Sequence, residues 1–362
     1  MFAVPRDAAY HGRVSLPAPL AARPARERAA LRRRLDRLYL DFDRRYLETD
    51  PLALVHPYRD DADREIAGFI AAGLAFGNVR AIKASVSAVL AALGPSPSAF
   101  VDRLDGRRGV EAHEGDPANS IDGVAGNGPP SRTGEKNKRR AGEPHDGLPA
   151  VTAETEHHER GKKNEGAELA GLYHRWIRSE DIVRTLRVLG LMRRRSGTIG
   201  GFFLEGYEPA DEDIGRSLAS FSERARALAG SLPGGGSVDR FFPSPRDGSA
   251  CKRLNLYLRW MVRDGDGLDL GVWKSVSRRQ LVLPLDTHLV RLSRALGLSA
   301  RRSPGWAMAV EATRSLALLD PGDPVKYDFA LSRLGILDRC LHGHDPLDCR
   351  RCTPPRPSVR RR

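Results

Sequence analysis

Residues 105–168 form a long segment that contains no Phe, Trp or Tyr and no regular spacing of apolar residues. Such a segment buries too little apolar surface to offset the conformational entropy that is lost when a chain is ordered. We therefore expect a disordered insertion there, so that the residues on either side of it build the core. Disorder is also expected in residues 1–25 and in the basic tail that follows Cys352.

The remaining sequence shows the apolar period of amphipathic helices. The helices that we expect lie at residues 29–46, 63–76 and 79–93 before the insertion and, after it, at 177–191 (led in by residues 173–176), 211–228, 250–262, 286–296, 306–318 and 324–334. The run from Ile66 to Phe76 is rich in Ala and Gly, so a neighbouring helix can approach it closely. No strand-rich region, internal repeat or glycine-rich phosphate loop is evident in the sequence. The sequence therefore predicts an all-α fold, in two helical lobes that need not be consecutive in sequence.

The chain is basic, with 59 Lys and Arg against 46 Asp and Glu and a formal net charge of +13. Such an excess favours an extended polyanion as partner, and DNA is the one that we expect. The alternative is a proteome whose richness in Arg makes many of its proteins basic. No run approaches the ~18 apolar residues that a membrane span needs, and residues 1–13 lack the apolar stretch of a signal peptide. We therefore expect a cytoplasmic protein, which DNA binding would bring to the nucleoid.

A first chemical motif is Gly248-Ser-Ala-Cys-Lys252-Arg-Leu-Asn255, which precedes an apolar run. Backbone N–H groups at a glycine-lined helix N-terminus can hold a DNA phosphate, and a lysine one turn further on can point at the sugar. The register of Gly248, Lys252 and Asn255 resembles that of the helix-hairpin-helix DNA glycosylases. The Leu-Pro-Gly-Val-Gly hairpin of that family is reduced here to residues 243–248. For Lys252 taken alone, the alternative is a solvated helix position.

A second motif is Leu283-Pro-Leu-Asp286-Thr-His288-Leu-Val-Arg291-Leu. The simplest role for Asp286 is to cap the helix that follows it. The whole string, with His288 and Arg291 in register, also resembles a Val-Asp-Thr-His segment of the same glycosylases. That resemblance implies that the Asp286 carboxylate stabilises a sugar cation while Lys252 attacks the anomeric carbon and forms a Schiff base. Residues 263–281 separate the two motifs more widely than in the family, which leaves open whether the two side chains meet.

Three of the four cysteines fall within Cys340-Leu-His342-Gly-His344-Asp-Pro-Leu-Asp-Cys349-Arg-Arg-Cys352. In a reducing compartment such a cluster favours metal ligation over disulfides. Its place after the last helix resembles that of the [4Fe-4S] loop of endonuclease-III-type glycosylases, but one of the four cysteines of that loop is missing. The sequence therefore predicts either an iron–sulfur cluster or a Cys3His zinc site that uses His342 or His344. The third alternative is a vestigial loop.

Five stretches resemble a bacterial family known as domain of unknown function 2400, and the resemblance extends over nearly all of the ordered chain. The stretches are residues 50–58, 74–80, 173–175, 243–262 and 323–336. The resemblance to that family implies no particular activity. The glycosylase likeness, in turn, implies a groove between two lobes in which a flipped nucleotide would lie. The candidate groove residues are Arg80, Lys83, Tyr173, His174 and Arg175. For His174 the alternative is a packed interior position, and for Arg80 it is a surface charge.

The expected domain organisation follows from these patterns. A helical N-terminal part spans residues 26–104, a helical lobe spans 169–230, a glycosylase-like core spans 238–338, and the Cys/His loop with the basic tail spans 339–362. Two hypotheses for function stand side by side. One is a DNA glycosylase with abasic-site lyase activity, and the other is a non-catalytic nucleic-acid-binding relative that kept the fold. Contact between Lys252 and Asp286 would favour the enzyme, and the sequence specifies no oligomeric state.

Overall fold

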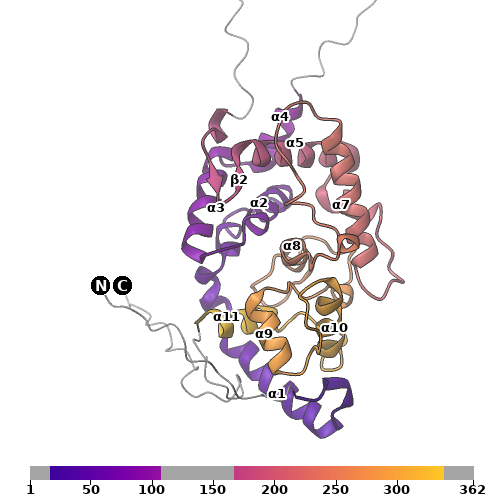
Figure 1. The fold of residues 1–362 in the computed structure, drawn as a ribbon. Coiled ribbons are helices and arrows are strands. Elements are labelled where there is room, and N and C mark those ends of the chain that lie inside the picture. Colours follow the sequence, from indigo (N-terminus) through magenta and orange to yellow (C-terminus); the bar gives the residue numbers. More distant parts are fainter. Residues whose placement is uncertain (1–16, 107–166, 338–362) are drawn as a thin grey trace, which may run out of the picture. The chain divides into compact units, whose positions relative to one another are not determined.

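The computed structural model of the chain describes residues 17–106 and 167–337, and of these residues 17–106 and 168–337 belong to one compact unit (Figure 1). The elements before the insertion are the 3₁₀ helices η1 (Leu20–Ala22), η2 (Arg44–Thr49) and η3 (Pro51–Leu54) and the helices α1 (Ala25–Asp41), α2 (Asp61–Gly73), α3 (Val79–Leu93) and α4 (Pro97–Gly106). The elements after it begin with η4 (Ala167–Leu169), the strands β1 (Tyr173–His174) and β2 (Ile177–Arg178), and the helices α5 (Ser179–Ser196), α6 (Ile199–Leu204) and α7 (Gly215–Gly230). The last elements are η5 (Pro245–Asp247), α8 (Lys252–Val262), η6 (Arg278–Gln280), α9 (Thr287–Ala295), α10 (Trp306–Ala317) and α11 (Asp328–Leu337).

These elements confirm the all-α class. The only sheet in the described ranges is the antiparallel pair β1 and β2, in which Tyr173 lies opposite Arg178. The expected helices are present, with ends shifted by a few residues. The helices α4 and α6 are additional to those expected. The sequence of α6, Ile-Gly-Gly-Phe-Phe-Leu, is too short and too rich in glycine to show a helical period.

Two helix starts follow from their cap residues. The Asp60 carboxylate accepts hydrogen bonds from the backbone N–H groups of Ala62 and Asp63, at 2.9 and 3.1 Å, and so begins α2. The Asn78 side chain accepts one of 2.9 Å from the N–H of Arg80 and begins α3. These side chains satisfy N–H groups that have no partner within the helix. The Asn78 cap also ends the loop between α2 and α3, which becomes part of a cavity wall described below.

Helices that are far apart in sequence pack together, α2 against α8 and α1 against α11 (Figure 1). A Cβ atom added to Gly68 would lie 2.7 Å from Cε of Met261, and one added to Gly73 would lie 2.7 Å from the ring of Phe241. The small residues of α2 therefore allow the close approach that the sequence predicts. This packing holds the start of α8, where Lys252 lies, beside the end of α2.

Most buried apolar side chains of the described residues belong to one continuous core, and the division into two lobes stays a prediction. No single helix within residues 17–106 and 167–337 is long and apolar enough to cross a membrane. The helices α3 and α4 reach that length and composition only as a pair, across a bend of 64°. Most of the segments expected to be disordered fall outside the described residues, as does the Cys/His loop with its tail.

Candidate active site

A cavity of about 820 Å³ lies among the start of α8, the start of α9, the loop between α2 and α3, and α11. Its wall includes Lys252, Asp286 and His288, which the sequence singled out. The other lining residues are Thr49, Asp50, Pro51, Ala75, Phe76, Gly77, Asn78, Val79, Ile82, Ala250, Leu256, Arg259, Pro284, Leu285, Thr287, Val290, Pro304, Asp328, Ser332 and Arg333. The structure thus brings Lys252 and Asp286 to one cavity despite the long segment between their helices.

Lys252 is half-buried in the cavity wall as the first residue of α8. Its Nζ atom donates a hydrogen bond of 2.7 Å to the backbone oxygen of Ala75. Burial lowers the pKa of this amine below the usual lysine value, although the charges of three carboxylates, those of Asp286, Asp328 and Asp50, act in the opposite direction. A lowered pKa increases the neutral, nucleophilic fraction of the amine near neutral pH. The surroundings of Lys252 therefore favour the neutral amine more than those of an exposed lysine do.

Asp286 precedes α9 and caps it. Its Oδ1 atom accepts hydrogen bonds of 2.9 Å from the backbone N–H groups of His288 and Leu289. The capping role proposed as the simplest explanation is therefore present. Both bonds go to the same oxygen, and Oδ2 accepts no hydrogen bond from a residue that the structure describes. The cap thus fixes the orientation of a carboxylate that lines the cavity, and it uses only one of the two oxygens.

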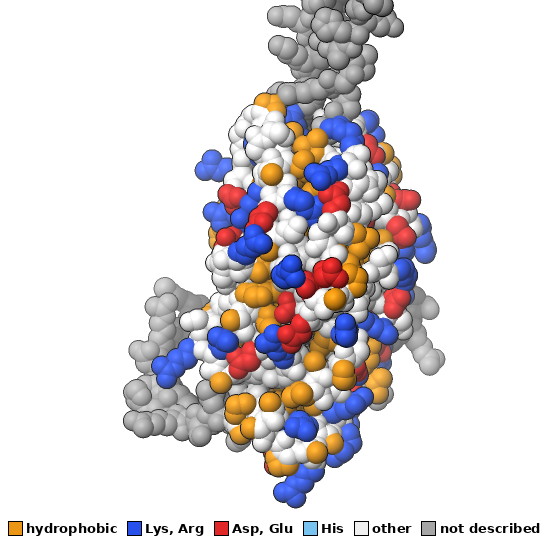
Figure 2. Space-filling model, turned by 90° about the vertical axis from the view of Figure 1, so that its right-hand side faces the viewer, with side chains coloured by type: hydrophobic (Ala, Val, Ile, Leu, Met, Phe, Trp, Pro, Cys, Tyr) orange, Lys and Arg blue, Asp and Glu red, His pale blue; other side chains and the backbone are white. Residues whose placement is uncertain are grey.

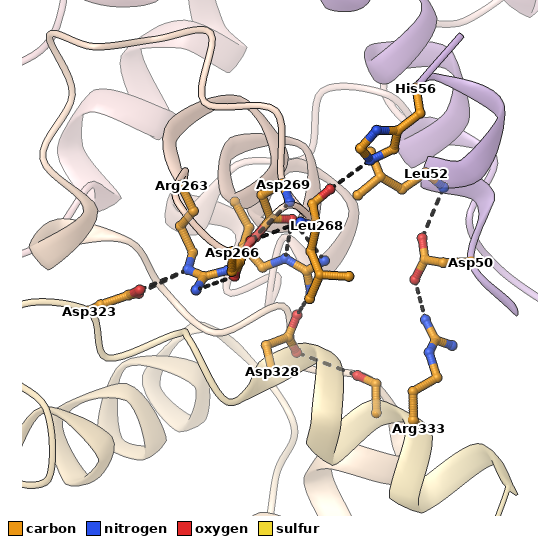
Figure 3. Close-up of polar contacts among 12 residues, drawn as sticks. Asp50, Leu52, His56, Arg263, Asp266, Leu268, Asp269, Asp323, Asp328 and Arg333 are labelled. Carbon is orange, nitrogen blue, oxygen red and sulfur yellow. Dashed lines mark hydrogen bonds and ion pairs between the residues drawn. The ribbon is translucent and has the colours of Figure 1, made fainter. Parts of the chain in front are cut away.

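A buried network of arginines and aspartates lies behind this wall (Figure 3). Arg259, from the middle of α8, pairs with Asp328 and, at 3.2 Å, with Asp269. Arg263 also pairs with Asp269 and, at 3.0 Å, with Asp323. Since Arg259 and Asp328 line the cavity themselves, the network connects its wall to the interior of the protein. An ion pair therefore holds the side chains of Arg259 and Asp328 in this wall.

A second buried ion pair, between Asp50 and Arg333, also lines the cavity. Figure 3 shows Asp50 between the side chain of Arg333 and the backbone of Leu52, whose N–H donates a 3.0 Å hydrogen bond to it. Burial alone would raise the pKa of Asp50, but the charges of Arg333 and Arg259 outweigh burial and hold this pKa below the usual value. Asp50 is therefore an ionised group of the wall at neutral pH.

Gly248 and Asn255 lie near the start of α8 and outside the cavity lining. Gly248 adopts a left-handed φ of 73°, and its carbonyl accepts a hydrogen bond of 3.2 Å from the N–H of Trp306. Asn255 is buried, and its Nδ2 donates a hydrogen bond of 3.1 Å to the oxygen of Ala250. These contacts hold the loop from which α8, and with it Lys252, begins. A phosphate contact of Gly248 or Asn255 stays a prediction.

The remaining basic candidates lie at the surface of α3 and α9. Arg80 and Arg291 are exposed, and neither forms an ion pair within the part of the chain that the structure describes. Lys83, by contrast, pairs with Glu48 at 3.1 Å. Arg80 and Arg291 are therefore the more available of these charges for an anionic partner.

Three of the candidate groove residues lie in the hairpin of β1 and β2, and of these one is buried and two are exposed. His174 is buried, and its ring nitrogens lie 3.0 Å from Oγ of Ser85 and 3.0 Å from the backbone oxygen of Phe76. His174 therefore occupies the packed interior position that was its alternative in the sequence analysis. Tyr173 and Arg175 are exposed. His174 therefore supports the hairpin, while its two neighbours reach solvent.

Four charged residues of the cavity wall, Asp50, Arg259, Asp328 and Arg333, were not among the candidates. The run that follows Lys252 contained a signal for one of them, because Arg259 interrupts the otherwise apolar stretch from Leu256 to Val262. A charge within a buried helix must have a partner. The partners themselves come from distant parts of the sequence, so no local pattern identifies them.

The predicted metal ligands Cys340, His342, His344, Cys349 and Cys352 lie outside the described residues. Within residues 17–106 and 167–337, no group of three or more His, Cys, Asp or Glu side chains is placed to hold a metal ion. The remaining thiol, Cys251, is buried, and burial raises its pKa to about 12. A thiol in such surroundings is a poor metal ligand.

Figure 2 shows one face of the molecule, on which basic, acidic and apolar side chains are interspersed. The positive net charge is not gathered there into a continuous basic area. This face therefore gives no extended attraction for a polyanion.

Comparison with known proteins gives a single result. A family model described as "Protein of unknown function (DUF2400)" matches residues 50–115 and 144–337, which include both Lys252 and Asp286. No curated protein and no solved structure matches the chain. Because the match covers most of its length, the chain belongs to this family of unknown function, DUF2400.

Proposed function

We propose that the chain binds DNA at the cavity and excises a damaged base, with Lys252 as nucleophile and Asp286 as its charge partner. The observation that carries this proposal is that an aspartate and a lysine with a lowered pKa line the same cavity. At about 820 Å³, the cavity falls within the range of small-ligand sites. A nucleotide flipped out of the DNA stack is a ligand of suitable size and chemistry.

The proposed reaction uses the two groups in sequence. The bond between C1′ of the sugar and the base nitrogen breaks, and the bonding electrons leave with the base. The carboxylate of Asp286 offsets the positive charge that develops on the sugar. The neutral amine of Lys252 adds to C1′ and then passes a proton to the departed base anion. The C1′–O4′ bond breaks as the nitrogen lone pair forms the C=N bond of the Schiff base, and O4′ takes up a proton from solvent. The lowered pKa of Lys252 supports this role, because only the neutral amine has a free electron pair.

Borohydride trapping tests the proposal directly. Reduction of the Schiff base between Lys252 and the aldehyde of an abasic site leaves the protein joined to the oligonucleotide through a secondary amine. We expect an adduct with the unmodified protein and none with Lys252→Gln. The matched control is Lys83→Gln, which removes a lysine paired with Glu48 and should leave trapping unchanged. Trapping that persists in Lys252→Gln would mean that another amine reacts.

A non-catalytic role in nucleic-acid binding is the second candidate function. It is favoured by the structural contacts that both groups already make, since Lys252 donates to Ala75 and Asp286 caps α9. A binding protein of this kind would yield neither an adduct nor a released base across a panel of damaged oligonucleotides. Its affinity for DNA would be the same with and without the Lys252 amine.

A further inference from the structure

The hairpin of β1 and β2 has a turn that is strained for its sequence. Arg175 and Trp176 form this two-residue turn between His174 and Ile177. Arg175 has a φ of 55°, in the left-handed region that glycine enters freely and other residues enter only at a cost in energy. Glycine would serve the turn better than arginine does. The side chain of Arg175 therefore has a role that offsets this cost in energy.

The side chains of the turn belong to a column of rings and guanidinium groups. The rings of Phe76 and Trp176 are stacked, with centroids 5.0 Å apart and planes inclined by 26°. The guanidinium carbon of Arg175 lies 4.8 Å from the centroid of Trp176, and that of Arg240 lies 5.6 Å from it. The guanidinium carbon of Arg253 lies 5.0 Å from the centroid of Phe76. Three positively charged side chains thus lie against two aromatic rings.

These charges lack acidic partners, since no carboxylate within the described ranges pairs with Arg175, Arg240 or Arg253. Arg253 is half-buried and donates hydrogen bonds to the backbone oxygens of Gly73, at 2.8 Å, and of Arg240. Burial, and then the charge of Arg240, lower the pKa of Arg253 to about 10. Arg175 and Arg240 are exposed. Uncompensated positive charge at this density attracts anions.

The column adjoins the cavity that contains Lys252. Phe76 and Gly77 line the cavity, and a Cβ atom added to Gly77 would lie 3.1 Å from Nη1 of Arg175. Trp176 is 49 % exposed, and Tyr173 on the neighbouring strand is 74 % exposed. They are the only aromatic side chains among the exposed large hydrophobic residues of the described ranges. Exposed aromatic rings beside arginines are typical of binding surfaces.

We propose that this hairpin surface, made of Tyr173, Arg175, Trp176 and Arg240, binds a single-stranded stretch of DNA next to the nucleotide in the cavity. Arginines bind phosphates, and aromatic rings stack on the faces of bases. The bases of an intact duplex are stacked on one another and offer no free face to the exposed rings of Tyr173 and Trp176. The ligand is therefore unpaired strand. The choice of nucleic acid rests on the proposed function, but the binding site itself lies outside the cavity.

Fluorescence anisotropy of the full-length protein with labelled oligothymidylate tests this surface. Trp176→Leu should lower the affinity about tenfold, as expected for the loss of one stacked base. Arg175→Gly should also lower it, while the Tm stays the same or rises because glycine relieves the strained φ. Leu318→Ala is the matched control, since Leu318 at the end of α10 is also 49 % exposed and should leave the affinity unchanged. Polyglutamate should compete weakly, because it offers charge without bases.

Several results would overturn the inference. The inference fails if the protein does not bind oligothymidylate, or if both turn variants bind it with unchanged affinity. It fails if intact duplex binds as strongly as the single strand. It also fails if polyglutamate competes as strongly as oligothymidylate does. A lower Tm of Arg175→Gly at unchanged affinity would likewise show that the arginine serves the fold. Borohydride trapping reports on Lys252 independently. A failure of the cavity chemistry is therefore distinguishable from a failure of the hairpin surface.

Discussion

The Nζ atom of Lys252 donates a hydrogen bond of 2.7 Å to the backbone oxygen of Ala75. This bond joins the first residue of α8 to the segment that follows α2. The packing of α2 against α8 therefore also determines where the amine lies. Since an amine donates N–H groups whether or not it is protonated, the contact can hold Lys252 at the cavity wall in both states.

The pH dependence of trapping should report on the surroundings of this amine. Adduct yield should rise with pH as Lys252 loses its proton, with a midpoint below ~10.4, the ordinary lysine value. Burial, which disfavours the ammonium form, is the cause. Asp286→Asn removes a negative charge that favours the ammonium form, so its midpoint should lie at lower pH. The measurement is adduct yield against pH, with cyanoborohydride and a preformed abasic site.

The Asp286→Asn variant is also its own control for folding. Asparagine caps a helix about as well as aspartate does, so α9 should keep its start and the variant its Tm. A midpoint that stays in place, or rises, would contradict the role of Asp286 as a charge neighbour of Lys252.

Asp50→Asn should destabilise the protein strongly. Asparagine can keep the hydrogen bond from Leu52, but it leaves the buried charge of Arg333 without its partner, at a cost of about 3–5 kcal/mol. Glu212→Gln is the control, because it breaks an exposed pair with Arg314 and should cost less than about 1 kcal/mol. Urea unfolding measures both. Equal losses in the two variants would show that burial is not the cause.

Acid should reduce the difference between Asp50→Asn and the unmodified protein. The pKa of Asp50 lies below its usual value in the folded chain, so ionised Asp50 stabilises the fold fully above about pH 3.9, the ordinary Asp value. That stabilisation is lost as the pH falls through the lower, folded pKa. Unfolding free energies of the two proteins should therefore converge in that range. A constant difference down to the lowest pH at which the protein folds would refute the assignment.

Gly73→Ala and Gly230→Ala should change stability in opposite directions. The new Cβ atom at position 73 meets the buried ring of Phe241 at 2.7 Å, and such overpacking costs about 1–3 kcal/mol. At Gly230, the last residue of α7, nothing lies within 4 Å, and alanine should stabilise by about 0.4–1 kcal/mol because it restricts the unfolded chain. Gly68→Ala should fall between them, since the end of the flexible Met261 side chain can move. Urea unfolding of the three variants measures the order, and a stabilising Gly73→Ala would contradict the packing of α2.

Under the proposed function, binding to DNA should depend on salt through exposed arginines that form no ion pair within the described residues, such as Arg80. Each phosphate contact contributes about one unit to the slope of log affinity against log salt concentration. We expect Arg80 to contact one phosphate, so Arg80→Ala should reduce the slope by about one unit. Lys83→Ala should change the slope less, because Glu48 already neutralises that lysine. Equal changes in both, or binding insensitive to salt, would contradict this division of roles.

Local sequence signals were sufficient for most helices and for how one of them begins. Asp60 and Asn78 cap α2 and α3, although neither was expected as a cap. Asp286, by contrast, was expected to cap the helix that follows it, and its side chain accepts the N–H groups that a cap satisfies. The small residues of α2 likewise indicated close packing. These features depend on neighbours within one or two turns, so one sequence reveals them.

Such local signals did not predict the hairpin of β1 and β2. Strands of two residues are too short to show an alternating pattern. Its turn also lacks the glycine that usually marks a left-handed residue, because Arg175 occupies that position. Residues 173–176 were therefore expected only to lead into a helix.

Sequence alone was enough to assign the helical class, because periodicity is local, and the resemblance to the glycosylases made Lys252 and Asp286 candidates. That the two side chains share a cavity, and that burial outweighs three carboxylates in setting the pKa of Lys252, follows only from the folded chain. Two of those carboxylates, Asp50 and Asp328, come from distant parts of the chain. Desolvation and Coulomb interactions depend on distances in space, and separation along the sequence says nothing about these distances until the chain has folded.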